Sequence, residues 1–149
     1  MSTDIGLNPP GTRHDRVVGG VAVVAGIKFG DVVISDTTPG AGHRDVKLTA
    51  VAGDKPVAGI CVAQTDPTTG SAIGDNIEIC DTGICEVNLA AGETILKGDV
   101  LVTAAVNGQV KKLGAEVTYD IVGRAFQAAT SGASPIRISV ELSAPFATK

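Results

Sequence analysis

Short runs of apolar residues extend from Val17 to position 142, separated by turn residues about every 8 to 14 positions. This spacing is typical of an all-β sandwich or barrel, and no helical period competes with it. The segment 135–140 alternates apolar and polar residues, which predicts one buried and one wet face, whereas 57–63 is apolar on both faces, as central strands are. The pattern predicts strands over 17–24, 31–35, 45–51, 57–64, 75–80, 83–89, 99–103, 108–113, 119–128 and 135–142.

The residues between these runs are those that turns require. Asn107-Gly108 is the strongest hairpin signal, because both residues tolerate a positive φ. Asp81-Thr82-Gly83 likewise predicts a turn, which would separate strands 75–80 and 83–89. Other turns are predicted at 38–40, 53–54, 66–70 and 131–132.

The chain repeats one order of phrases. Segment 27–34, IKFGDVVI, recurs as 95–102, ILKGDVLV, and in each copy a Gly-Asp pair leads into a strand. Each Gly-Asp pair predicts a turn whose carboxylate accepts hydrogen bonds from nearby amides. Segment 56–61, PVAGIC, recurs as 120–125, DIVGRA, with a glycine that fits a kink or a close backbone crossing.

Two further phrases complete the repeat: 46–48, VKL, matches 110–113, VKKL, and 77–79, IEI, matches 136–138, IRI. The chain is therefore predicted to form two small β-barrel or sandwich lobes, 17–89 and 90–149, with a shared or adjoining core. Residues 1–16 are predicted to form an extended N-terminal arm, because Asn8-Pro9-Pro10-Gly11 disfavours helix and favours extended backbone.

Composition and charge exclude several classes of partner. The 149 residues include only four aromatic ones, three Phe and one Tyr, so stacking on single-stranded nucleic acid has little to use. The net charge of −4 supplies no basic field for phosphates or for an anionic membrane. No apolar run is long enough to span a bilayer, and the start lacks a basic and apolar leader, so synthesis in the cytoplasm is expected.

Groups for catalysis or for metal binding are sparse in the sequence. His14 and His43 lie in the arm and in a glycine-rich loop, where solvated roles are expected. The cysteines, Cys61, Cys80 and Cys85, are interpreted as small, reduced, buried residues, although Cys80 and Cys85 might face each other across the predicted turn. No enzymatic activity, metal or cofactor is expected.

Two motifs suggest a catalytic or a carrier alternative. Asp81-Thr82-Gly83 after an apolar strand resembles the turn of aspartic proteases, and 120–125 resembles a segment of their dimeric members. Such enzymes need two of these turns face to face, and this chain has one, so a partner would have to supply the second. The Gly-Asp-Val phrases suggest a lipoyl or biotinyl carrier, but an exposed hairpin lysine context is missing.

The order of the phrases resembles the head-decoration, or capsid cement, proteins of tailed bacteriophages. The resemblance covers about residues 17–142 and is carried by Lys97-Gly98-Asp99, Gly108-Gln109-Val110 and Val122-Gly123-Arg124-Ala125. It implies a non-enzymatic virion protein on the outer surface of an expanded head, where homotrimers bind the major capsid protein and stabilise contacts between its subunits. Another virion or tail β-module and the dimeric aspartic protease remain the alternatives.

Contact residues are inferred from the arm, because an extended segment can bind a partner edge through its main chain. The candidate capsid-binding residues are Leu7, Asn8, Pro9, Pro10, Arg13, His14 and Arg16.

Overall fold

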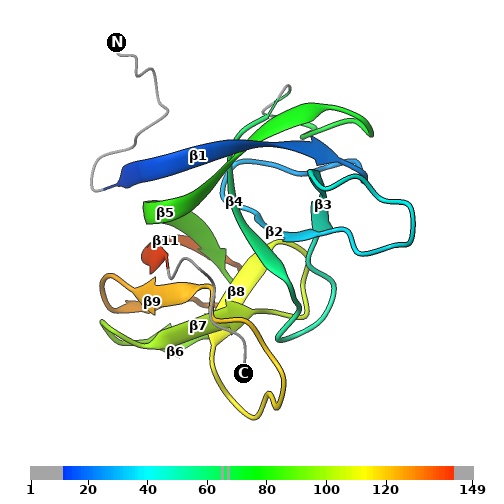
Figure 1. Ribbon diagram of the computed structural model, residues 1–149. Helices are drawn as coiled ribbons and strands as arrows, with labels where there is room; N and C mark the ends of the chain where they lie inside the picture. Colours follow the sequence, from blue (N-terminus) through cyan, green and yellow to red (C-terminus); the bar gives the residue numbers. More distant parts are fainter. Residues whose placement is uncertain (1–11, 65, 67, 143–149) are drawn as a thin grey trace.

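The computed structural model describes residues 12–64, 66 and 68–142 (Figure 1). All regular secondary structure in these residues is β-strand, so the all-β prediction is confirmed. The strands are β1 (Arg13–Ala22), β2 (Val32–Ser35), β3 (Asp45–Leu48), β4 (Val57–Ala63), β5 (Asn76–Leu89), β6 (Thr94–Ile95), β7 (Val100–Thr103), β8 (Gln109–Lys112), β9 (Gly123–Ala125), β10 (Ala129–Thr130) and β11 (Ile136–Leu142).

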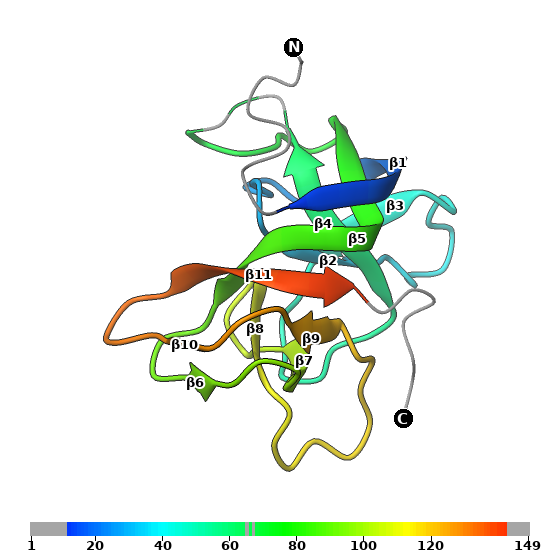
Figure 2. The ribbon, with the colours of Figure 1, turned by 90° about the vertical axis from the view of Figure 1, so that its left-hand side faces the viewer.

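The strands form two closed rings that share β5 (Figure 2). The first ring runs β1-β3-β2-β4-β5, and β5 pairs back with β1. The second ring runs β5-β8-β7-β9-β11, and β11 pairs back with β5. Strands β6 and β10 form a separate two-stranded sheet.

The two rings have the same internal register, which confirms the repeat. Val33 pairs with Leu48 and with Gly59 in the first ring. In the second ring Leu101 pairs with Lys112 and with Gly123 in the same way. Segments 56–63 and 120–127 therefore occupy equivalent places.

Strand β5 is the last strand of the first ring and the opening strand of the second. In the first ring β1 runs parallel to β3, with Ala22 opposite Val46. In the second ring the end of β5 runs parallel to β8, with Leu89 opposite Val110. The 14-residue strand thus joins the rings without a linker.

The predicted break at Asp81-Thr82-Gly83 was wrong, because these residues continue β5. The local turn signal is overridden by pairing with β1, which places Arg16 opposite Thr82 and His14 opposite Gly83. The irregularity survives only as register shifts in this pair of strands.

Two further predictions need correction. Strand β1 begins at Arg13, so Arg13, His14 and Arg16 belong to a paired strand and not to an extended arm. The register also matches Ile77 with Ile138, and not with Ile136, because Cys61 opposite Ile79 corresponds to Ala125 opposite Val140.

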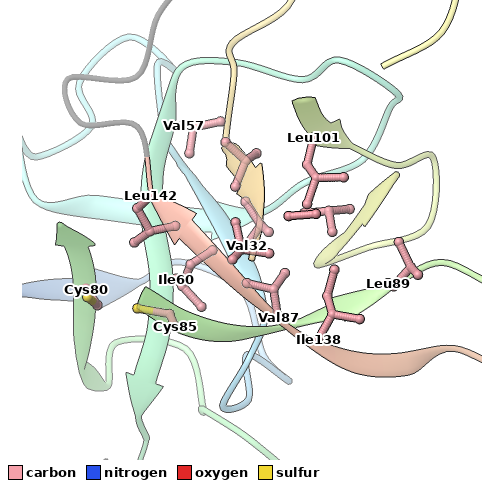
Figure 3. Close-up of a cluster of buried hydrophobic side chains, with 14 of the residues drawn as sticks. Val32, Val57, Ile60, Cys80, Cys85, Val87, Leu89, Leu101, Ile138 and Leu142 are labelled. Carbon is pink, nitrogen blue, oxygen red and sulfur yellow. The ribbon is translucent and has the colours of Figure 1, made fainter. Parts of the chain in front are cut away.

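The core has two parts that follow the rings. One cluster fills the first ring and includes Ala22, Val33 and Ile79. The larger cluster fills the second ring and continues onto the outer face of the first, where Ile60 is fully buried (Figure 3). The residue equivalent to Ile60 in the second ring is Arg124, which is exposed, because no other ring covers that face among the described residues.

The Gly-Asp turns form as predicted. The Lys28 amide donates to the Asp31 carboxylate at 2.9 Å, and the Leu96 amide donates to that of Asp99 at 2.8 Å. The preceding glycines, at positions 30 and 98, have φ values of 89° and 88°, which favour glycine. The turns lead directly into β2 and β7, which are equivalent strands of the two rings.

A repeated serine contact was not predicted. Ser71 is buried and its hydroxyl accepts from the Ile27 amide at 3.2 Å, while Ser131 accepts from the Glu93 amide at 2.9 Å. Each serine also donates to a backbone carbonyl of the same loop. The two serines close equivalent loops of the two rings.

Candidate binding surface along strand β1

The predicted contact residues divide between described and undescribed parts of the chain. Leu7, Asn8, Pro9 and Pro10 lie outside the described residues. Arg13, His14 and Arg16 lie together in the first half of β1, where the flanking residues are also largely exposed.

Arg16 binds the Asp81 carboxylate with two nitrogens. Its Nε lies 2.9 Å from Oδ1, and its Nη2 contacts Oδ2. The Asp81 side chain is 9% exposed and that of Arg16 is 67% exposed, so the guanidinium covers a nearly buried carboxylate. The motif that resembled a protease turn is thus held in mid-strand by a residue of the candidate surface.

The other two β1 candidates have different surroundings. Arg13 forms an ion pair with Asp15 at 2.9 Å, in which both side chains are well exposed. The Nε2 atom of His14 is buried and has no hydrogen-bond partner among the described residues. Burial lowers the pKa of His14, which favours the neutral ring.

Strand β1 has one open edge. It pairs with β5 over its length, but β3 covers its opposite edge only at Val21 and Ala22. Within the described part of the chain no strand pairs with that edge from Arg13 to Gly20. The Val21 amide donates to the Arg44 carbonyl, away from β5. Because amides alternate along a strand, those of Val17 and Gly19 also point away from β5, toward the open edge.

The open edge leads into a hollow of about 360 Å³ at the mouth of the first ring. Its apolar lining comes from Val18, Val46, Ala58 and Ile79, and its polar lining includes Arg44 and His43 at the rim. Val18 is 39% exposed, so apolar surface beside the edge is open to solvent.

A larger hollow of about 550 Å³ lies elsewhere on the first ring, beside the Asn107 hairpin. Leu48 and Val51 line it together with Lys47 and Lys55. Lys47 is 3.7 Å from Asp36, so one of the two lysines has a carboxylate beside it.

The cysteines are free and buried, as predicted. Figure 3 shows Cys80 and Cys85 pointing toward one another from the two halves of β5. Their hydrogen bond and burial raise the pKa of Cys85, the same hydrogen bond lowers that of Cys80, and burial raises that of Cys61 to about 12. The raised pKa makes Cys61 and Cys85 poor nucleophiles at neutral pH.

The described residues contain no group of three or more His, Cys, Asp or Glu side chains placed to hold a metal ion. They also contain no helix long and apolar enough to cross a membrane.

No protein-family model matches the chain, and no curated protein matches it. Among solved structures, the chain is similar to the head fiber gp8.5 N base of bacteriophage phi29. The sequences are 16% identical, the TM-score is 0.46, and the match covers 86% of this chain and 93% of that chain. A likeness of this size identifies neither a family nor a function.

Proposed function

We propose that the chain is a structural protein of a tailed-phage virion. It binds the outer surface of the expanded head as a homotrimer and stabilises contacts between major capsid subunits. Its role is mechanical, without a catalytic site or a cofactor.

One observation carries the proposal: each phrase behind the sequence resemblance has a defined place in one ring. Gly98-Asp99 is the turn into β7, Gly108 precedes β8 while Gln109 and Val110 begin it, and Gly123 lies in strand β9. Gly30-Asp31 and Gly59 take the same places in the other ring. In this chain the phrases therefore belong to one ordered scaffold, which supports the proposal.

The joining of the rings suits a mechanical role. Because β5 belongs to both rings, the lobes cannot separate without breaking its pairing with β1, β4, β8 or β11. The core also continues from one ring onto the other. A rigid body of this kind can hold several weak contacts at fixed spacing, and such contacts add up across a repeating shell.

The test uses expanded heads prepared without the protein. Purified chain is added, and bound chain is measured by co-sedimentation and located by electron microscopy. We expect saturable binding on the outer surface at three-fold positions, with heads that resist heat better after binding. Binding to tails or fibres alone would favour the other virion module and would reject the head assignment.

The part of the predicted arm (1–16) that precedes β1 is tested separately by deleting residues 2–11, which leaves β1 and the Arg16–Asp81 contact in place. We expect the truncated chain to fold and to bind heads at least tenfold more weakly. Arg13→Gln tests a described candidate, and Arg124→Gln, an exposed position of the second ring, is its control. Full-strength binding by both the truncation and Arg13→Gln would remove residues 2–11 and Arg13 from the contact.

A further inference from the structure

Equivalent strand edges of the two rings differ in whether another strand pairs with them. Ile84 of β5 takes the place in the second ring that Val17 of β1 takes in the first, because each precedes by five residues the matched pair Leu89 and Ala22. Ile84 pairs with Arg13 of β1, which runs antiparallel to β5. The second ring thus has an antiparallel strand on an edge that, among the described residues, stays open in the first ring.

The mouths of the two rings also differ, because a smaller side chain stands at the mouth of the first ring. Gly59 and Gly123 are equivalent, so Ala58 of the first ring corresponds to Val122 of the second. Val122 is fully buried, whereas Ala58 is partly buried and lines the hollow of about 360 Å³. The smaller residue leaves space that the second ring fills with its own side chain.

Arg44 lines the hollow of about 360 Å³ and brings a positive charge to it. Its Nε donates to the Gly19 carbonyl at 3.2 Å, and it forms no ion pair with any described residue. A guanidinium has five N–H donors, so its terminal nitrogens can bind a carboxylate with both of its oxygens. His43 lies beside it at the rim.

We propose that the open edge of β1 and the mouth of the first ring form a docking site for an extended, antiparallel segment of a partner protein in which aliphatic and acidic residues alternate. The outward amides of Val17 and Gly19 bond the partner's main chain. One aliphatic side chain enters the hollow beside Ala58, and a neighbouring carboxylate binds Arg44. Main-chain bonds supply affinity in this mode of recognition, and the pocket and the charge supply selectivity. The inference goes beyond the proposed function and holds for any partner with this chemistry.

The probe is a blocked seven-residue peptide of alternating valine and glutamate, labelled for fluorescence anisotropy, with a valine–lysine peptide as its charge control. We expect the full chain to bind the glutamate peptide at least tenfold more tightly than the lysine peptide. Ala58→Val, which copies the second ring, should weaken binding at least tenfold, and Arg44→Gln should abolish the preference for glutamate. Arg124→Gln should leave both affinities unchanged.

A folding control, a second variant and hydrogen exchange complete the test. Circular dichroism establishes that Ala58→Val is folded, and Val17→Pro, which removes an outward amide, serves as a second variant with the same expected loss. Hydrogen exchange should show new protection at Val17 and Gly19 when the glutamate peptide binds.

Several results would overturn the proposal. These are no binding at 1 mM peptide, equal binding by Ala58→Val and wild type, or protection at an edge other than β1. Sedimentation of the chain alone supplies one more: self-association that Ala58→Val abolishes would assign the edge to a second copy and reject a foreign partner.

Discussion

Asp31 and Asp99 occupy the same turn in the two rings, yet their surroundings shift their pKa values in opposite directions. Asp31 lies where the rings meet, and its Oδ1 accepts from Asn88 at 3.3 Å. Burial raises the pKa of Asp31 to about 6, against an ordinary value of 3.8. Asp99 is bonded by the Leu96 amide and lies near Lys112, and both lower its pKa.

The consequence for stability follows from proton linkage. Between pH 4 and 6 the folded state holds more protons at Asp31 than the unfolded state does, so the free energy of unfolding falls as pH rises. The stabilising contribution of Asp31 is full below about pH 4 and is lost as pH rises through about 6. A difference of about 2 pKa units corresponds to about 3 kcal/mol. Asp99 has the opposite sign, because a lowered pKa gives stability that is lost as pH falls.

The assay is urea unfolding of wild type, Asp31→Asn and Asp99→Asn between pH 3 and 8. An asparagine at 31 keeps an acceptor for the Lys28 amide and removes the buried charge. We expect the stability of Asp31→Asn relative to wild type to rise by up to about 3 kcal/mol from pH 4 to pH 7. Asp99→Asn should show the reverse slope. A flat difference for Asp31→Asn, or the same slope for both variants, would refute the assigned environments.

Three other predictions concern packing, pairing and reactivity. Gly123→Ala should destabilise the fold by about 3 kcal/mol in urea unfolding, because its Cβ would lie 2.3 Å from a carbonyl oxygen, whereas Gly132→Ala meets open space and should be neutral. Arg16→Ala should destabilise more than Arg13→Ala, because only Arg16 covers a nearly buried carboxylate; equal losses would argue against that role. Cys61 should resist a thiol reagent at pH 8 until the chain is denatured, and rapid labelling of the native protein would contradict its burial.

Features that local chemistry controls could be predicted from the sequence. The Gly-Asp turns formed because a short carboxylate can bond the amide three residues earlier, as at Asp31 and Asp99. Gly123 marks a close crossing because no side chain fits against the neighbouring strand. Both signals lie within a few residues, so neither needs tertiary information.

Features that depend on distant partners could not be predicted. Asp81-Thr82-Gly83 has the composition of a turn, and only pairing with β1 and the ion pair to Arg16 keep it inside β5. The match of Ile77 to Ile136 was wrong by two positions because alternating strands look the same after a shift of two residues. Only the cross-strand register distinguishes the two alignments.

The candidate surface was predicted only in part. Arg13 and Arg16 lie on it, but the open edge and the hollow beside Ala58 arise from comparing the rings, and the sequence shows only that Ala58 stands where the other copy has Val122. A small residue in place of a larger one in an internal repeat is the signal that would have indicated the hollow.

The most direct measurement is electron microscopy of expanded phage heads with and without the added chain. The proposed function predicts additional density on the outer surface at three-fold positions, shaped as two fused rings per subunit. Heads that look identical with and without saturating chain would contradict it.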